Sequence, residues 1–214
     1  MANSLIYKKK KNRIPKKELA KFSYKFEQNV LKENVGSQDQ IACAYGGFNS
    51  IKFYKDGSFK VTKIGNDNFI NTLNKNLLLF YTGKQRTAEK IAKTFINLLP
   101  NEKKDNVLEI LNIVKEAKKI ISSSDHKLFG KLLGESWKIK KSLSSHISDS
   151  KIDSIYDEAV DSGALGGKIL GAGGGGFMLF YVPQSKQKKV LLKLKKLTHI
   201  PFTFSKKGSE IVKI

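Results

Sequence analysis

Apolar side chains recur at helical intervals near the start of the chain and predict a first helix over residues 16–32. The side chains of this stripe are Leu19, Phe22, Phe26 and Val30. A shorter apolar stretch, residues 39–45, follows a turn at Gly36 and predicts a second helix. We expect Gly46 and Gly47 to end it, because glycine is a poor helix former.

A β-hairpin is predicted next, because two apolar segments, 48–55 and 58–64, flank Asp56-Gly57. An Asp-Gly pair suits a two-residue turn in which both central residues have positive φ. After the hairpin, Gly65-Asn-Asp-Asn68 interrupts the pattern, which indicates a subdomain boundary near residues 65–75.

The middle of the chain is predicted to contain one buried strand and three helices. Residues 75–82 form a nearly continuous apolar run of strand length. Apolar positions then recur at helical spacing, and the expected helices cover residues 85–98, 103–121 and 126–145.

The last part of the chain predicts short strands around a run of glycines. A helix over 152–162 is expected to end at Gly163, a residue type common at helix C-termini. The run Gly171-Ala-Gly-Gly-Gly-Gly176 lies between two strand-like segments. The later predicted elements are a basic helix at 184–197 and strands near 200–205 and 209–213. Strands interspersed with helix pairs predict an α+β fold with a mixed or antiparallel sheet.

The formal net charge of +21 over 214 residues invites a nucleic-acid interpretation, which the residue types weaken. All of the 40 basic residues except Arg13 and Arg86 are lysines, and they are spread along the whole chain. Proteins that read nucleic-acid sequence usually rely on arginine forks. We therefore expect lysines that solvate helix faces, and no nucleic-acid partner.

Composition also argues against export and against a membrane partner. Cys43 is the only cysteine, which excludes an internal disulfide and fits a reducing, cytoplasmic compartment. The first residues are polar and lysine-rich, unlike a secretory signal. No run of the sequence approaches the ~20 apolar residues that a membrane span needs.

The glycine run matches two phosphate-binding patterns only in part. Gly171, Gly173 and Gly176 satisfy G-x-G-x-x-G, but a strand-like segment follows where the dinucleotide fingerprint needs a helix. Gly167-Lys168 is followed by Ile169, where a P-loop needs Ser or Thr. We expect instead a tight loop between two strands that exposes backbone N–H groups to a phosphate-bearing ligand. The plainer alternative is a hairpin with flexible glycines.

Motifs in several separate places resemble those of the GHMP kinases. The segment from Asp153 to Tyr181, with its glycine run, resembles the third motif of this superfamily. The further motifs are Gly36-Ser-Gln-Asp-Gln40, Tyr45-Gly-Gly-Phe-Asn49, Leu79-Phe-Tyr-Thr-Gly83 with Arg86, and Gly134-Glu-Ser-Trp137 with Lys140. Together they are similar to the bacterial D-glycero-D-manno-heptose 7-phosphate kinase branch. The resemblance implies phosphoryl transfer from Mg-ATP to the anomeric hydroxyl of that sugar phosphate, on a route to surface polysaccharide.

The resemblance also implies roles for individual residues. Asp39 matches the family's catalytic aspartate, which accepts or orients the proton of the attacking hydroxyl. Glu27 matches a glutamate that helps to hold Mg²⁺. The run formed by Gly171, Ala172, Gly173, Gly174, Gly175 and Gly176 would support the phosphate-binding loop for ATP. The residues implied to contact the sugar phosphate are Gln38, Tyr45, Gly46, Gly47, Asn49 and Arg86, with Lys84 adding charge.

Other interpretations remain open. Asp39 could simply cap the helix that begins there, since Asp favours the N-cap position. Glu27 could be an ordinary solvated helix residue, and Arg86 an ordinary surface arginine. The substrate could be that of another GHMP sugar kinase, of the fucose or galactose type. A non-catalytic module that still binds the sugar phosphate is a further alternative.

Two motifs that precede these in the family are not found in this sequence, including a glycine- and serine-rich loop that wraps the ATP phosphates. The resemblance therefore implies an N-terminally truncated chain. Residues 1–74 would be the incomplete tail of a first domain that resembles ribosomal protein S5, and residues 75–214 a ferredoxin-like C-terminal domain. We expect such a chain to be a poor or inactive kinase alone, with a separately encoded N-terminal half as its partner.

Overall fold

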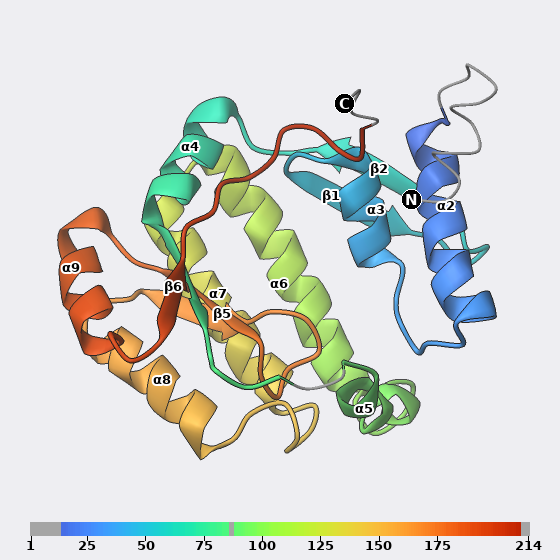
Figure 1. Cartoon of the computed structure of the whole chain (residues 1–214). Helices are drawn as coiled ribbons and strands as arrows, with labels where there is room; N and C mark the ends of the chain where they lie inside the picture. Colours follow the sequence, from blue (N-terminus) through green and yellow to red (C-terminus); the bar gives the residue numbers. More distant parts are fainter. Residues whose placement is uncertain (1–13, 86–87, 211–214) are drawn as a thin grey trace. The chain divides into compact units, whose positions relative to one another are not determined.

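The computed structural model describes residues 14–85 and 88–210, which form two compact units (Figure 1). The first unit contains the described residues up to Ile64 and those from Phe204 onward. The second unit is Gly65–Thr203. No helix in the described ranges combines the length and the apolar character that spanning a membrane requires.

The first unit combines helical segments with a hairpin. Its elements are α2 (Lys16–Lys25), η1 (Phe26–Val30), α3 (Gln38–Tyr45), β1 (Asn49–Phe53) and β2 (Phe59–Lys63). In η1 the helix widens to a π-helical turn, where the Leu31 amide donates to the Phe26 carbonyl oxygen at 3.1 Å. The helical segment formed by α2 and η1 ends at Val30, two residues before the predicted end of the first helix. The buried core of the first unit consists of Ala20, Ile41, Ala44 and Phe59.

The predicted hairpin is confirmed, because β1 and β2 pair antiparallel, but its turn differs from the prediction. The Tyr54 amide donates to the Ser58 carbonyl oxygen at 2.9 Å, which makes the loop three residues long. In such a loop a single position is left-handed, and here it is Gly57 with φ +76°. The expectation of a positive φ at Asp56 is therefore wrong. Hydrogen bonds from Ser58 to the Asp56 carboxylate lower the pKa of Asp56.

The C-terminal segment completes the first unit through backbone hydrogen bonds. The Gly47 amide donates to the Ser205 carbonyl oxygen at 2.8 Å, and the Ser209 amide donates to the Cys43 carbonyl oxygen at 2.9 Å. Residues 204–210 form no strand, so the strand expected over 209–213 is absent at its first two residues. The rest of that prediction lies outside the described residues.

The second unit contains a four-stranded sheet and most of the helices. Its elements are α4 (Asp67–Asn76), β3 (Leu77–Tyr81), α5 (Ala88–Lys93), η2 (Ile96–Leu98), α6 (Lys104–Ser123), α7 (His126–Lys141), α8 (Ser150–Asp161), β4 (Gly166–Ile169), β5 (Phe177–Tyr181), α9 (Gln184–Lys193) and β6 (Thr198–Ile200). The strand order is β4-β5-β3-β6 and every pair is antiparallel. This order, with helices after the first and third strands, is the ferredoxin-like arrangement. The strand expected near 200–205 is β6, which begins earlier and is shorter.

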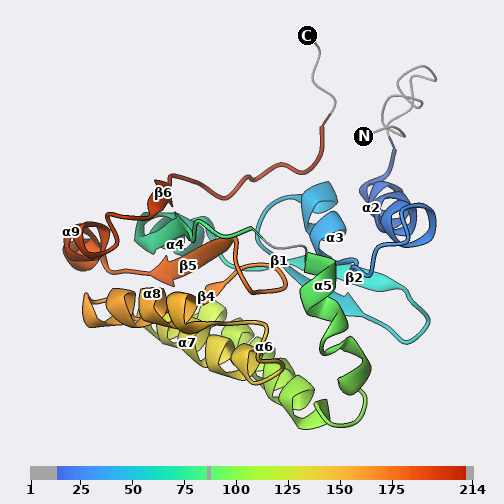
Figure 2. The same ribbon diagram turned by 60° about the horizontal axis from the view of Figure 1, so that its bottom comes forward.

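Helices α6, α7 and α8 lie together on one side of this sheet (Figure 2). Helix α7 packs closely on β4 because glycines face each other there: a Cβ on Gly166 would overlap the Gly130 carbonyl group. Trp137 of α7 is fully buried in the core, together with Phe80 and Phe180 of the sheet.

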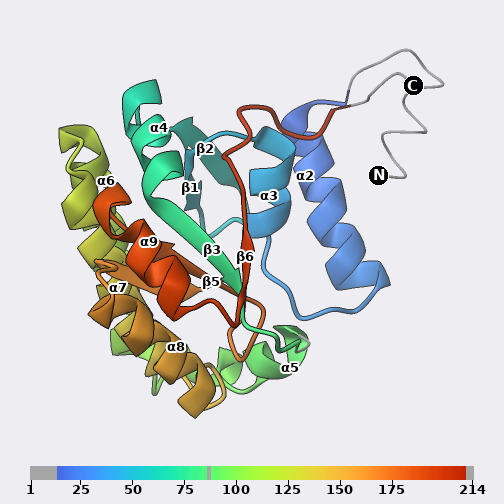
Figure 3. The same cartoon turned by 60° about the vertical axis from the view of Figure 1, so that its left-hand side comes forward.

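Helix α4, which runs directly into β3 (Figure 3), is the element that the sequence reading missed. Asn66 caps it by accepting the Phe69 amide at 2.8 Å, and Phe69 and Leu73 are fully buried. Helix α4 packs with the second unit, and the division falls after Ile64, at the start of the region, residues 65–75, where the sequence indicates a subdomain boundary.

Candidate functional site

The residues implied by the resemblance fall into two sets. The first unit holds Glu27, Gln38, Asp39, Tyr45, Gly46, Gly47 and Asn49. The second unit holds the glycine run, residues 171–176, and Lys84. Arg86 lies outside the described residues.

Glu27 lies on η1 at the wall of a groove, where Gln40 of α3 donates a hydrogen bond to its carboxylate. The groove has a volume of about 370 Å³ and an apolar lining that includes Phe22, Phe26 and Leu31. Glu27 is half-buried and bonded, unlike an ordinary solvated helix residue. The Gln40 Oε1 atom is buried and lacks a hydrogen-bond partner among the described residues.

A single carboxylate at a groove wall fits Mg²⁺ better than a metal that needs an all-protein cage. Mg²⁺ is usually held by one or two carboxylates together with waters and substrate phosphates. Among the described residues, no group of three or more His, Cys, Asp and Glu side chains could hold a metal ion. Glu27 is thus suited to contribute one ligand to an ion that arrives with a nucleotide.

Asp39 is exposed in the first turn of α3. The helix begins at Gln38 and its N-cap residue is Ser37, so Asp39 does not occupy the capping position. A carboxylate in this turn interacts favourably with the positive end of the helix dipole. Exposure leaves its oxygens accessible to a hydroxyl donor. Gln38 is also exposed.

Several residues implied to contact the sugar phosphate have structural contacts in the first unit. Gly46 has φ +64°, and a Cβ there would overlap the backbone of Lys207. The Asn49 side chain donates to the Gly46 carbonyl oxygen at 2.8 Å. The Tyr45 ring packs edge-on against Phe59, with 6.3 Å between ring centroids. These contacts hold the turn after α3 in place, which is a structural role for Tyr45, Gly46 and Asn49.

The glycine run joins β4 to β5 and is packed on one side. Gly173 and Gly175 lie against backbone: a Cβ on Gly173 would come within 2.9 Å of the Ile147 carbonyl oxygen, and one on Gly175 within 2.6 Å of the Lys84 carbonyl oxygen. A Cβ on Gly171 or Gly176 would meet no other described atom within 4 Å. The run therefore has a packed side and an open side of bare backbone that a ligand can approach.

Two amides of the run are already used inside the protein. The Gly174 amide donates to the Ile147 carbonyl oxygen at 2.8 Å, and the Gly176 amide donates to the Lys84 carbonyl oxygen at 2.7 Å. The expected exposure of backbone N–H groups is wrong for these two residues, because the flanking loops take up both donors. The glycines are nevertheless more than flexible hairpin residues, since positive φ and close backbone contacts both demand them.

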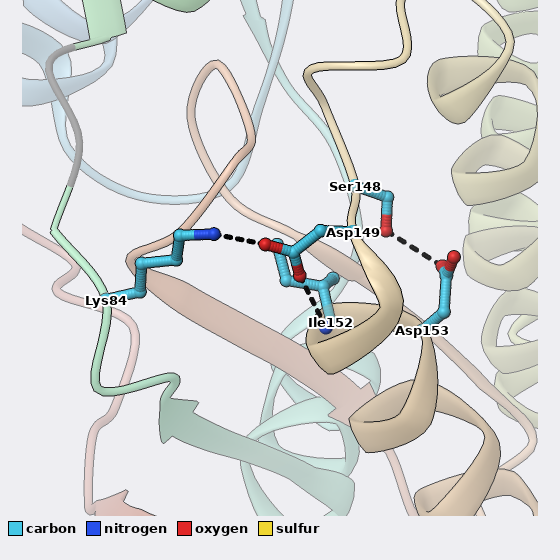
Figure 4. A network of polar contacts seen from close by, with 5 residues as sticks. All are labelled: Lys84, Ser148, Asp149, Ile152 and Asp153. Carbon is cyan, nitrogen blue, oxygen red and sulfur yellow. Dashed lines mark hydrogen bonds and ion pairs between the residues drawn. The ribbon is translucent and has the colours of Figure 1, made fainter.

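Lys84 forms an ion pair with Asp149, the residue that caps α8 (Figure 4). The second oxygen of Asp149 accepts the Ile152 amide at 3.0 Å. Close by, Ser148 donates to Asp153 at 2.8 Å, and Lys141 pairs with Asp153 at 2.9 Å. The resemblance implied that Lys84 lies near the sugar phosphate, but it did not predict the contacts of Asp149 and Ile147. Contacts between distant segments leave no local sequence pattern.

The environment of Lys168 on β4 disfavours the charged form of its side chain. Desolvation by burial lowers the pKa of Lys168, and its Nζ atom donates to the Ser136 hydroxyl at 3.2 Å. Desolvation likewise raises the pKa of Tyr156 on α8.

Comparison with known proteins agrees with the fold and the motifs. Residues 106–199 match the family described as GHMP kinases C terminal. A D-glycero-alpha-D-manno-heptose 7-phosphate kinase from Campylobacter jejuni is 33% identical over 89% of this chain and 58% of its own length. A mevalonate kinase from Methanocaldococcus jannaschii is 31% identical over 84% of this chain and 53% of its own length. The crystal structure of a putative sugar kinase from Campylobacter jejuni superimposes with a TM-score of 0.69 at 30% identity, covering 91% of this chain and 56% of that one.

Residues 106–199 thus match the C-terminal domain of the GHMP kinases, and the chain is similar to these kinases over most of its length. The α+β fold with its antiparallel sheet is the one expected for that domain. Its relatives are kinases, and kinases are phosphotransferases. The chain spans little more than half the length of the relatives named above.

Proposed function

We propose that this chain is part of an ATP-dependent kinase that phosphorylates the anomeric hydroxyl of D-glycero-D-manno-heptose 7-phosphate. The observation that carries this proposal is the 33% identity over 89% of the chain with the heptose 7-phosphate kinase from Campylobacter jejuni. With ATP as the phosphoryl donor, the enzyme would act in the cytoplasm and supply heptose for surface polysaccharide.

Three features of the described residues would serve this reaction. Asp39 is exposed and would accept or orient the proton of the attacking hydroxyl. Glu27 would help to hold Mg²⁺, which neutralises charge on the phosphates. The open side of the glycine run, at Gly171 and Gly176, would let the ATP phosphates approach the backbone. Gln38, Tyr45, Gly46, Gly47, Asn49 and Arg86 remain the proposed contacts of the sugar phosphate.

Full activity would need the portion of the relatives that this chain does not match, either in the same polypeptide or as a separate partner. The support for this is coverage: the chain spans 58% of the Campylobacter jejuni enzyme. In the resemblance, the missing portion carries the loop that wraps the ATP phosphates. Preorganised donors of that kind are a large part of catalysis in phosphoryl transfer.

The test is a panel of phosphoryl acceptors assayed with Mg-ATP: heptose 7-phosphate, galactose, fucose and mevalonate. The chain is assayed alone and mixed with the unmatched portion of the Campylobacter jejuni kinase, with the variant Asp39→Asn as the control for contaminating kinases. We expect heptose 7-phosphate to be the preferred acceptor in the mixture. Preference for mevalonate, which the 31% identity to a mevalonate kinase would favour, contradicts the proposed substrate but not the kinase class. Binding of heptose 7-phosphate without any transfer in the mixture favours a non-catalytic module.

A further inference from the structure

Two loops from distant parts of the second unit hold the glycine run between them. One is the loop after β3, in which the Lys84 carbonyl oxygen accepts the Gly176 amide at 2.7 Å. In the same loop, the Thr82 amide donates to the Gly176 carbonyl oxygen at 2.9 Å. The other loop precedes α8, and its Ile147 carbonyl oxygen accepts the Gly174 amide at 2.8 Å. The conformation of the run therefore depends on the position of both loops.

The ion pair between Lys84 and Asp149 connects the two loops directly (Figure 4). Lys84 acts through two groups, since its carbonyl oxygen binds Gly176 while its ammonium group binds Asp149. Asp149 also acts twice, because one carboxylate oxygen meets Lys84 and the other caps α8 through the Ile152 amide. The position of the glycine run is thus coupled to the N-terminus of α8.

We propose that Lys84 and Asp149 are positioning residues that hold the glycine run in the conformation that receives a nucleotide phosphate. We call this pair the latch. The identity of the ligand rests on the proposed function, whereas the effect of the latch on the run does not. Five of the six residues of the run have positive φ, and glycines explore such conformations freely unless contacts restrict them. A contact that holds the two neighbouring loops together restricts the conformations of the glycine run before a ligand binds.

The exposure of the latch sets the size of the expected effect. The two side chains retain 28% and 35% of their accessible surface, so solvent and salt screen the ion pair. Ion pairs at such sites usually make a modest contribution to stability. We therefore expect that loss of the ion pair changes the equilibrium constant for local opening of the glycine run by about 2–5-fold, and that the protein stays folded.

The variants Asp149→Asn and Lys84→Met test the latch. Asparagine is as good an N-cap residue as aspartate, so Asp149→Asn removes the charge of the latch while α8 stays capped. The matched control is Lys141→Met, which removes the neighbouring ion pair with Asp153. Hydrogen exchange of the Gly174 and Gly176 amides is measured by NMR, at low salt and in 1 M NaCl. Binding of Mg-ATP is measured by calorimetry on the same samples mixed with the unmatched portion of the Campylobacter jejuni kinase.

We expect both latch variants to exchange these two amides about 2–5-fold faster than the wild type at low salt, and the control to match the wild type. High salt should accelerate exchange in the wild type but not in the latch variants. The dissociation constant for Mg-ATP should rise by a similar factor in the latch variants. Unchanged exchange overturns the latch, whatever the protein binds. Faster exchange with unchanged Mg-ATP affinity overturns the positioning role. Failure of the wild type to bind Mg-ATP counts against both the positioning role and the proposed donor. In that case the exchange rates alone show whether the latch restricts the glycine run.

Discussion

Gly175 lies against the carbonyl oxygen of Lys84, so closely that a Cβ on Gly175 would come within 2.6 Å of that oxygen. The contact joins the loop after β3 to the middle of the glycine run. Because the obstacle is backbone, it cannot move aside as the end of a flexible side chain could. The run therefore requires glycine here for steric reasons as well as for its φ of +155°.

The substitution Gly175→Ala should lower the free energy of unfolding by about 2–3 kcal/mol, because it combines a backbone clash with an unfavourable φ. Gly171→Ala is the matched control in the same loop. Gly171 also has positive φ, but a Cβ there would meet no other described atom within 4 Å. Its cost should be only about 1 kcal/mol. Urea unfolding measures both, and equal losses would show that the contact with Lys84 has no energetic role.

Asp39→Asn should lower kcat by about 10²–10⁴-fold if Asp39 handles the proton of the acceptor hydroxyl. The KM for the acceptor should change little, because asparagine keeps the size and a carbonyl oxygen. The melting temperature should also stay close to that of the wild type, since Asp39 is exposed and does not occupy the N-cap position of α3. The assay uses the complemented protein, which is the chain mixed with the unmatched portion of the Campylobacter jejuni kinase. Circular dichroism checks that the variant is folded. A variant that keeps full kcat would remove Asp39 from the mechanism.

Glu27→Gln should raise the Mg²⁺ concentration needed for half-maximal activity by at least about tenfold, because a neutral amide is a poor ligand for Mg²⁺. Glu33→Gln is the control: this exposed residue lies in the same region of the first unit but does not line the groove. Titration of activity with Mg²⁺ at saturating ATP measures the effect. Identical titrations for both variants would show that Glu27 only anchors Gln40.

Lys168→Met should stabilise the second unit at pH 7 by about 1 kcal/mol, because burial penalises the lysine's charge. The pKa of Lys168 is lowered in the folded state from an ordinary value of 10.5. Between these two pKa values the unfolded chain binds more protons than the folded one, so wild-type stability rises with pH there. The advantage of the variant should therefore shrink as the pH approaches 10.5.

Chemical unfolding at several pH values between 7 and 10.5 measures this difference, with the exposed Lys119→Met as control. A constant difference between Lys168→Met and the wild type across that range would contradict the assigned role of burial.

The sequence predicted those parts of the fold that local patterns determine. Most of the amphipathic helices, the Asp56-Gly57 hairpin and the strands on either side of the glycine run were found in this way. The single helix predicted over 85–98 was wrong, because this region contains the short helix α5 and the separate 3₁₀ helix η2. Helix α4 was missed because the segment that begins at Gly65 was interpreted as a boundary. Asn66 at the N-cap and the apolar pair Phe69 and Leu73 nevertheless form the pattern of a capped helix. The turn at Gly57 could not be distinguished from a two-residue turn, because an Asp-Gly pair occurs in both kinds.

The candidate site was predicted less completely than the fold. The resemblance supplied Glu27, Asp39 and the glycine run, but not the groove beside Glu27 or its bond to Gln40. It also gave no indication that Ile147 and Lys84 bind two of the glycine amides. These contacts join residues far apart in the sequence, and only the folded chain brings them together.

The most direct test of the proposed kinase is the ³¹P NMR spectrum of D-glycero-D-manno-heptose 7-phosphate incubated with Mg-ATP and the complemented protein. We predict a new resonance from a phosphate on the anomeric oxygen, formed together with ADP and absent with Asp39→Asn. ADP formation without any sugar bisphosphate, or the same bisphosphate in equal yield with the variant, would contradict the account.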